Sequence, residues 1–392
     1  MMKDLGLAFD RIVVMSNDID RLGGIGRFMN QMAIEFHSLG IPVEMVGVGP
    51  APVGHLQPMS RPHDIDTTIL MSEHNPSDWT VRKFSHKLNP VRRGRYRVHK
   101  RLEEEAVSKL RHKFVTWGPR TLILCTQVYG MEYMLKAGYD ANDMSMPRVI
   151  GQYHGSAAEA SNIGDMNRVR KSYTDVDRFI CLSSEDAELF QAAGLNNVGW
   201  IPNPVAIPEH EAVQRRNVFM SLGRYDSIKS LDYFLRAWDL VNSVLPDWSV
   251  ELYGEGPERD YLAGIIDDYK IPRATLKGRT DSVGDVLASS RVHVLSSQNE
   301  GLPISIVEAG HMGCPSVAFD CAPGVSTLID DGIDGLIVEQ NNLPGLADGM
   351  RKIAESPELW SSMSESAVEH ASHYLPEQVM RLWVNELLEL SS

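Results

Sequence analysis

Short apolar runs alternate with amphipathic stretches along most of the chain, in two series separated near residue 200. The first series of strand-like runs is Arg11–Met15, Pro42–Val48, Thr121–Cys125, Arg148–Tyr153 and Arg178–Leu182. The second series is Asn217–Leu222, Ser249–Tyr253, Ala274–Lys277, Val292–Ser296 and Ser316–Phe319. Runs rich in Val and Ile that alternate with helices are typical of parallel sheets covered on both faces. The pattern therefore predicts an α/β fold with two such sheets.

Helical spacing of apolar residues occurs between these runs, for example at Gly26–Leu39, Leu231–Val244 and Ile304–Met312. Residues 201–208 interrupt the pattern with three prolines. Proline can neither continue a helix nor donate a hydrogen bond to a central strand, so we expect the interdomain linker there. Each of the two doubly wound domains would then bind ligands at the carboxyl ends of its strands. A final amphipathic helix is predicted by the spacing of five apolar residues, Val379, Leu382, Trp383, Leu387 and Leu390.

The composition is that of a globular protein with two domains. The 392 residues are 43% hydrophobic, and single cores stop growing well below that length. No apolar run approaches the roughly 20 residues that span a bilayer, and the first residues lack the features of a signal peptide. The four cysteines, Cys125, Cys181, Cys314 and Cys321, form no CxxC pair. We interpret them as reduced core residues of a cytoplasmic protein, neither disulfides nor metal ligands.

Charge is distributed unevenly along the chain. The formal net charge is −14, which argues against nucleic-acid binding. Nine Lys or Arg and no acidic residue lie between Arg82 and Arg101, which leaves the rest of the chain at about −23. This basic segment indicates an anionic partner, either the inner face of a membrane, with peripheral attachment, or a phosphate-bearing acceptor. Alternatively, it is a solvated helix face whose partner charges are Glu103, Glu104 and Glu105.

The first candidate for ligand binding is a glycine-rich stretch, Gly23-Gly24-Ile25-Gly26, that follows the strand Arg11–Met15. Glycines between a strand and a helix let backbone amides approach a phosphate at the positive end of the helix dipole. The spacing is not the dinucleotide-binding fingerprint, because the loop after Ser16 is long and no clear ribose-binding acid follows the next strand. A tight structural turn explains these glycines equally well.

Two cations follow the first strand of the second domain. Gly223 permits a turn after that strand, and Arg224 and Lys229 lie five residues apart just beyond it. At the carboxyl end of a parallel strand such cations can neutralise a diphosphate, Arg through its planar fork and Lys as a point charge. A pair of surface cations with no ligand is the alternative.

The strongest constellation is the segment from Ser296 to Glu308, where a buried strand leads through a polar turn into a helix. Pro303 suits the first turn of that helix, and the amides around Gly301 would point at a phosphate. Glu300 and Glu308 offer carboxylates, which accept charge-assisted hydrogen bonds from sugar hydroxyls. Glu300 could instead be a charge favoured by the helix dipole. Glu308 could be an exposed helix residue, although its apolar neighbours imply that it needs a partner.

Several motifs occur together in one order: Gly223-Arg224 with Lys229, then Tyr253–Arg259, Glu300 with Glu308, and Asp320–Gly324 followed by Asp331–Val338. In this the chain resembles the retaining glycosyltransferases of family 4, which have the GT-B fold of two Rossmann-like domains. The resemblance covers residues 215–345 almost without gaps. It is looser in the N-terminal half, where it is carried by Gly23-Gly24, His154, the strand Asp177–Ser183 and residues 201–205.

The resemblance implies roles for the residues of the second domain. Arg224 and Lys229 would bind the donor diphosphate and stabilise the charge of the leaving nucleotide. Glu308 would hold the ribose hydroxyls, and Arg279 would lie near the base. Glu300 would contact the transferred sugar and its phosphate, together with the turn formed by Gly301, Leu302, Pro303 and Ile304.

In the first domain, the resemblance places His154 in the sugar pocket and the Gly23-Gly24 loop beside the diphosphate or the acceptor. With the linker at residues 201–208, we expect domains at 1–204 and 205–375. The resemblance implies that a terminal helix at 376–392 packs back on the N-terminal domain. Retention of the anomeric configuration is likewise implied. The chain offers no covalent nucleophile that we would nominate, which fits a front-face displacement.

The expected activity is transfer of a hexose or N-acetylhexosamine from a UDP-sugar to a saccharide, a lipid-linked acceptor or another hydroxyl. A GDP-mannose-dependent mannosyltransferase is the first alternative. A nucleotide-sugar epimerase, a phosphorylase and a binding module without catalysis are further alternatives. The resemblance implies no cofactor and no metal, because the two cations and the helix amides would neutralise the diphosphate.

Overall fold

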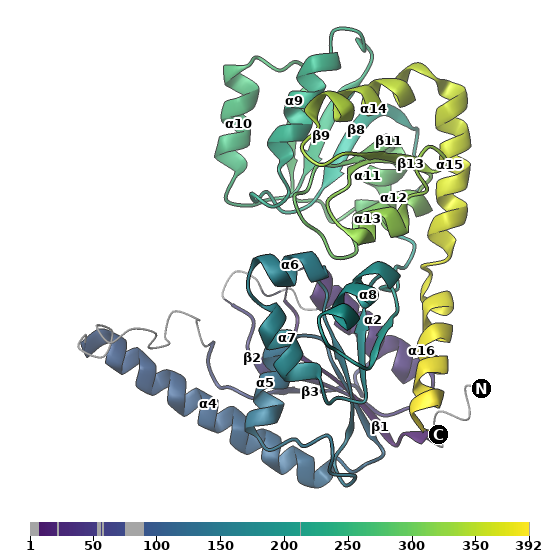
Figure 1. The fold of residues 1–392 in the computed structure, drawn as a ribbon. Coiled ribbons are helices and arrows are strands. Elements are labelled where there is room, and N and C mark those ends of the chain that lie inside the picture. The colour runs from purple at the N-terminus through teal and green to yellow at the C-terminus, as the bar shows by residue number, and fades with distance from the viewer. Residues whose placement is uncertain are drawn as a thin grey trace. The chain divides into compact units, whose positions relative to one another are not determined.

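The computed structural model describes residues 8–21, 23–52, 56, 59–74, 90–211 and 213–391. The chain forms two compact units (Figure 1). Unit 1 comprises Met1–Ile201 together with Met380–Ser392, and unit 2 comprises Pro202–Val379. The boundary at residues 201 and 202 lies in the proline-containing stretch, which has no helix or strand.

Unit 1 is built on a seven-stranded sheet in the order β3-β2-β1-β4-β5-β6-β7, in which every pair of neighbours is parallel. The strands are β1 (Arg11–Asp18), β2 (Val43–Gly49), β3 (Asp66–Ile69), β4 (Thr121–Cys125), β5 (Arg148–Gln152), β6 (Arg178–Cys181) and β7 (Val198–Trp200). Parallel strands require crossover connections, and the helices between them supply these. The five strands predicted for this half are all present.

The helices of unit 1 are α2 (Gly24–Ser38), α4 (Pro90–Thr116), α5 (Val128–Lys136), α6 (Ala157–Asn162), α7 (Met166–Tyr173), α8 (Ser184–Ala192) and the last helix of the chain, α16 (Pro376–Ser391). Phe36 of α2 is fully buried and meets Trp383 of α16 edge to face, with ring centroids 6.4 Å apart. Burial of such aromatic side chains is a large favourable contribution to folding. This contact explains why α16 is part of unit 1.

Unit 2 contains a six-stranded parallel sheet in the order β10-β9-β8-β11-β12-β13. Its strands are β8 (Arg216–Leu222), β9 (Ser249–Tyr253), β10 (Ala274–Gly278), β11 (Ser290–Leu295), β12 (Ser316–Phe319) and β13 (Gly335–Val338). Its helices are α9 (Leu231–Val241), α10 (Arg259–Asp268), α11 (Val283–Ser289), α12 (Ile304–His311), α13 (Pro323–Leu328), α14 (Leu343–Glu355) and α15 (Pro357–Ser372). The core includes Phe219, whose ring stacks on Trp248 at 4.4 Å.

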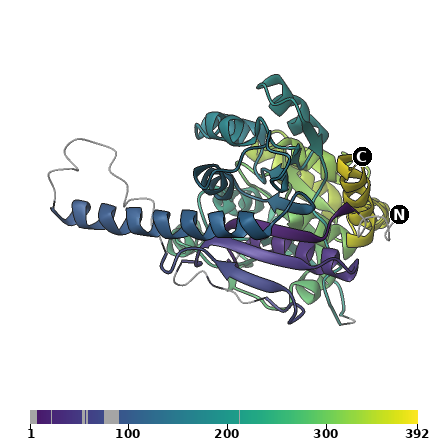
Figure 2. The same ribbon diagram turned by 90° about the horizontal axis from the view of Figure 1, so that it is seen from below.

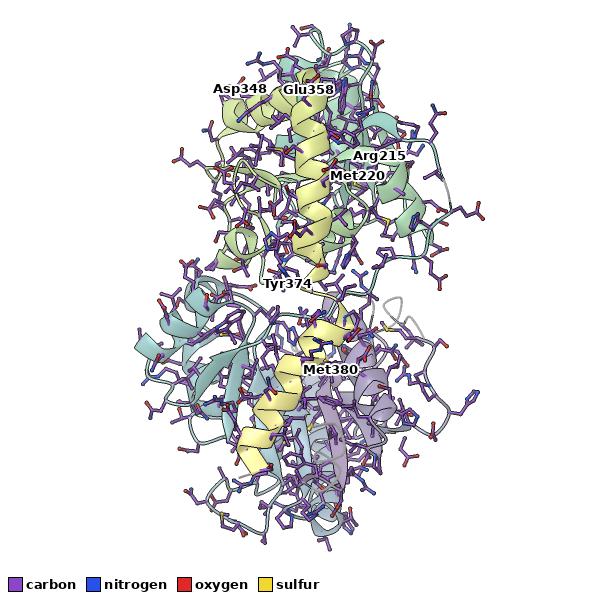
Figure 3. The ribbon with its side chains drawn as sticks, turned by 90° about the vertical axis from the view of Figure 1, so that its right-hand side faces the viewer. Arg215, Met220, Asp348, Glu358, Tyr374 and Met380 are labelled. Carbon is purple, nitrogen blue, oxygen red and sulfur yellow. The ribbon has the colours of Figure 1, made fainter. Side chains whose placement is uncertain are left out.

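Helix α15 is held to unit 2 by side chains at both of its ends. Figure 3 labels Arg215 near α15. Its guanidinium lies 5.4 Å from the Trp360 ring of that helix, a favourable cation–π distance. After the end of α15, the Tyr374 hydroxyl donates a 2.8 Å hydrogen bond to the Thr327 carbonyl. Figure 3 labels Tyr374 and, a turn into the next helix, Met380, where unit 1 resumes.

Three details differ from the sequence-based expectations. Strand β1 continues to Asp18, so the connection to α2 is short rather than long. Pro303 is the residue before α12, with an extended backbone, and not part of its first turn. The short strands β3, β7 and β13 have no counterpart among the predicted runs.

The four cysteines are free, as expected. Cys125, Cys181 and Cys314 are buried, and Cys321 is partly exposed. Burial raises the pKa of each thiol to about 12, so these side chains stay protonated at neutral pH. Within the described part of the chain, no helix is long and apolar enough to cross a bilayer.

Candidate active site

The turns that follow the strands of unit 2 are joined by backbone hydrogen bonds. The Gly223 amide donates to the Tyr253 carbonyl at 3.0 Å, which links the ends of β8 and β9. The Gly254 amide donates to the Gly278 carbonyl at 2.9 Å, which links β9 to β10. Because each turn is fixed by its neighbour, the side chains that these turns carry are held at one edge of the sheet.

Lys229 and Glu300, which come from different motifs, form an ion pair at this edge. The Lys229 Nζ lies 2.6 Å from the Glu300 Oε1, and both side chains are largely buried. The same Glu300 oxygen accepts a 2.6 Å hydrogen bond from the Ser297 hydroxyl. The structure therefore brings together two predicted site residues that are 71 positions apart.

Backbone contacts fix the two turns that carry this pair. The Gln298 amide donates to the Ile228 carbonyl at 2.7 Å, and the Ser296 hydroxyl donates to the Lys229 carbonyl at 3.0 Å. Ser296 and Ser297 are both buried. Sequence reasoning did not assign these two serines a role, although a pair of small hydroxyl residues at a strand end is a visible signal for side chain–backbone bonding.

Arg224 lies on the turn after β8 and is the more accessible cation. Its side chain is 57% exposed, and its Nε is 3.8 Å from Asp226. The Asp226 carboxylate also accepts a hydrogen bond from the Lys229 amide at 3.3 Å. The exposed guanidinium and the partly exposed ammonium, on the same turn, offer a planar fork and a point charge to one anionic ligand.

Helix α12 carries the second half of the candidate donor motif. Leu302 and Pro303 are buried, Gly301 and Ile304 are partly exposed, and the helix begins at Ile304. Glu308, one turn into the helix, is only 8% exposed, so the expectation of an exposed residue is excluded. Gly324 at the start of α13 packs so closely on the Gly301 carbonyl that a Cβ there would overlap it.

Arg279 follows β10, two strands away from β8 in the sheet order. Strand spacing places these strand ends about 10 Å apart. The Arg279 side chain is half exposed and lies 3.7 Å from Asp281. It therefore lies at the same sheet edge as Arg224, on the side away from Glu300.

The remaining predicted residues are in unit 1, at the carboxyl edge of its sheet. His154 follows β5, and its ring meets Phe28 of α2 edge to face at 4.6 Å. Its Nε2 has no hydrogen-bond partner among the described residues. Burial lowers the pKa of His154 to about 4, so the ring is neutral at pH 7. Gly23, with φ 135°, is the residue before α2. Gly24 is the first residue of α2 and is exposed.

One group of side chains in the described residues has the composition of a metal site, namely Asp330, Asp334 and His370 in unit 2. The His370 Nδ1 already lies 2.5 Å from the Asp334 Oδ2. The Asp334 Oδ1 accepts a hydrogen bond from the Asp330 amide. This buried carboxylate is thus satisfied by protein groups, and we interpret the cluster as a structural link between α15 and the loop before β13.

This link predicts a pH-dependent stability. The hydrogen bond from His370 to Asp334 raises the pKa of His370 in the folded protein. The bond therefore stabilises the fold fully below the pKa of His370 in the unfolded chain, near 6.5. This stabilisation is lost as the pH rises through the higher pKa of the folded protein. We expect His370→Gln to cost about 1.5 kcal/mol at pH 6 and much less at pH 9. Urea unfolding at the two pH values measures this, with the exposed neighbour His373→Gln as control. An equal loss at both pH values would contradict the charged pair.

Comparison with solved structures defines the class of fold. The Anabaena protein HepE in complex with UDP matches 97% of this chain and all of its own length, with a TM-score of 0.74 and 15% sequence identity. Together with the two parallel-sheet units, this shows the predicted α/β architecture of two Rossmann-like domains, the GT-B fold.

Comparison of sequences shows which family unit 2 resembles. Residues 204–370 match the family Glycosyl transferases group 1. The chain is 31% identical over 214 residues to an uncharacterized glycosyltransferase of Haemophilus influenzae, covering 54% of this chain and 61% of the relative. It is 26% identical over 292 residues to a poly(ribitol-phosphate) alpha-N-acetylglucosaminyltransferase of Staphylococcus aureus, covering 67% and 58%. Residues 204–370 thus resemble a glycosyltransferase family domain, and the chain spans about six-tenths of the length of these relatives.

Proposed function

We propose that the protein transfers a hexose or N-acetylhexosamine from a UDP-sugar to a hydroxyl group of a saccharide or lipid-linked acceptor, with retention of configuration. The observation that carries the proposal is the Lys229–Glu300 pair, with Arg224 beside it, at the strand ends of a group 1 glycosyltransferase domain. HepE, which shares the fold, has been solved with UDP and with UDP-glucose.

The two cations would act on the leaving group. As the bond between sugar and phosphate breaks, negative charge grows on the nucleotide diphosphate, and Arg224 and Lys229 stabilise it. To contact a phosphate, Lys229 exchanges part of its interaction with Glu300 for the new anion. The Glu300 carboxylate, still held by Ser297, then accepts a hydrogen bond from a sugar hydroxyl.

The protein would need no metal for this step, because two cations and the amides before α12 supply the positive potential. Glu308 would accept hydrogen bonds from the ribose hydroxyls, and Arg279 would lie near the base. The acceptor hydroxyl would lose its proton to the departing phosphate in a front-face displacement. The roles of His154 and the Gly23-Gly24 loop beside the sugar and the acceptor remain predictions.

Nucleotide binding tests the donor. We expect UDP at 100 times its Kd to stabilise the protein by about 2.7 kcal/mol, a shift of about 5 °C or more in Tm. GDP and ADP should give less than half of that shift, because the donor pocket is proposed for uracil. The UDP shift should persist in EDTA. Stabilisation by GDP alone would replace the UDP assignment with the GDP-mannose alternative, and loss of the UDP shift in EDTA would contradict metal independence.

Product analysis tests the reaction. Release of UDP from a UDP-sugar should depend on an added acceptor, and mass analysis should find the sugar on that acceptor. Release that is independent of any acceptor, or a changed sugar still attached to UDP, would favour an epimerase over a transferase.

A further inference from the structure

The N-terminal part of helix α4 carries a dense run of exposed cations. Residues 90–101 contain no acidic residue. They contain six cations: Arg92, Arg93, Arg95, Arg97, Lys100 and Arg101. The other basic residues of the predicted segment, Arg82, Lys83 and Lys87, lie outside the described residues. Figure 2 shows α4 as a long rod whose first turns extend away from the body of unit 1. We call residues 90–101 the basic arm.

The fold places the basic arm beyond the carboxyl edge of the unit 1 sheet. Lys109 of α4 reaches the carbonyl of Ile69, the last residue of β3, at 3.5 Å. Arg101 pairs with Glu73, just past the strand end, at 3.1 Å. The eleven residues before Arg101 therefore continue past that edge for about 16 Å at 1.5 Å per residue. The carboxyl edge is where ligands bind in this kind of fold.

Acidic residues pair with the last two cations of the arm, Lys100 with Glu103 and Arg101 with Glu73. Glu103 pairs with Lys100 and also with Lys136, outside the arm. Glu105 pairs with Lys109. Arg93 and Arg97 have no ion-pair partner among the residues described. Glu103 therefore pairs with one cation of the predicted segment, Lys100, whereas Glu105 pairs with a lysine outside it. Among the described residues, these carboxylates are partner charges for only part of the segment.

The position of the charges is also unfavourable for the helix itself. The first turn of α4 has no acidic residue. Cations near a helix N-terminus oppose the helix dipole by roughly 0.3–1 kcal/mol each. Core packing begins at the partly buried Val98 and continues with Leu102, Ala106 and Leu110, so it does not reach the first turn. An anion bound at Arg93, in the first turn of the helix, would offset this unfavourable interaction.

The arrangement of the charges favours a chain-like polyanion over a flat bilayer. Arg93, Arg97 and Arg101 follow i, i+4 spacing along one side of the helix, and Arg92 and Arg95 fall on the other side. A helix that lies on a bilayer has an apolar face opposite its charges. The exposed apolar residues of the arm, Val91 and Tyr96, are not on one face.

We propose that the basic arm binds a linear, phosphate-bearing polymer, and that this polymer carries the acceptor hydroxyl. The arm flanks β3, which is two strands from β1, so it begins about 10 Å from the strand end that leads into the Gly23-Gly24 loop. A polymer several units long spans this distance. The second part of this inference rests on the proposed function, whereas the binding of the polymer does not.

Binding is tested with a labelled long-chain linear polyphosphate, and orthophosphate serves as the monomeric control. The variant Arg93→Gln/Arg97→Gln should bind polyphosphate about 10-fold more weakly, with a smaller salt dependence, because fewer counterions are released. The control Arg111→Gln/Arg236→Gln removes the same charge from exposed sites outside the arm and should stay within about twofold of the wild type. If both variants lost polyphosphate affinity equally, the effect would depend on net charge alone, and the proposal would be overturned.

Two further measurements separate the outcomes. UDP should stabilise the arm variant as much as the wild type, and UDP release stimulated by a ribitol phosphate polymer should show a KM raised about 10-fold with unchanged kcat. If neither the wild type nor the variants bound UDP, the proposed function would be contradicted, but the binding of a polymer by the basic arm would not. An arm variant that keeps polyphosphate binding, and loses only binding to vesicles containing phosphatidylserine, would replace the polymer with a membrane.

Discussion

We expect Lys229→Ala to lower the turnover of sugar transfer at least about 100-fold, since loss of one group that stabilises developing charge has an effect of this size. Lys229 is a largely buried cation of the candidate site, and its Nζ lies 2.6 Å from Glu300. Without the ammonium, the leaving diphosphate keeps Arg224 as its cation on this turn. The Glu300 carboxylate also loses the partner that offsets its charge and repels the donor.

Acceptor-dependent UDP release at saturating donor measures this effect, and Tm is recorded for each variant so that lost activity is not mistaken for unfolding. Lys352→Ala, at an exposed position of α14, is the matched control and should keep full turnover. Glu300→Gln separates the two causes, because it keeps a hydrogen-bond acceptor for Ser297 but leaves Lys229 without a counter-charge. Near-normal turnover of Lys229→Ala would remove this lysine from the site.

The sheets could be predicted from the sequence because their central strands are nearly continuous apolar runs. Thr121–Cys125, Ser249–Tyr253 and Ser316–Phe319 were predicted with the bounds that the structure has. Strand β3 could not be found in this way. It is an edge strand whose residues, Asp66–Ile69, are mostly exposed, so its sequence carries no hydrophobic pattern.

The individual motifs of the site were also visible in the sequence, but their contacts were not. Lys229 meets Glu300 because β8 and β11 are neighbours in the sheet, and strand order is a property of the fold. The burial of Glu308 follows from the packing of α12. For His154, the neutral state at pH 7 depends on burial beside Phe28, which lies in a different element.

For the basic segment, too, the contacts between side chains could not be predicted from the sequence. Its sequence left open whether Glu103 and Glu105 neutralise it, because residues at i+3 and i+4 on a helix can form ion pairs. The structure shows that these carboxylates are shared with Lys136 and Lys109. Lys136 belongs to α5, so this sharing depends on how α5 packs against α4.

Gly324→Ala should displace the turn from Gly301 to Ile304, although Gly324 belongs to the neighbouring helix α13. A Cβ at this position would overlap the Gly301 carbonyl and press on the Cα of Leu302, all of which are backbone atoms that cannot rotate away. Overpacking of this kind costs about 1–3 kcal/mol when neighbours shift. The shift would move the turn that joins Glu300 to α12, so we expect the Kd for UDP to rise at least about 10-fold with the lost contacts.

Thermal unfolding and UDP titration measure the two effects in one preparation. Gly264→Ala is the matched control, because Gly264 is inside α10 and a Cβ there would meet nothing within 4 Å. Replacing a helical glycine should stabilise the protein by about 0.5–1 kcal/mol without changing UDP affinity. If Gly324→Ala lowered Tm but left the Kd for UDP unchanged, the turn from Gly301 to Ile304 would not contact the nucleotide. The donor would then be bound by Arg224 and Lys229 without the amides before α12.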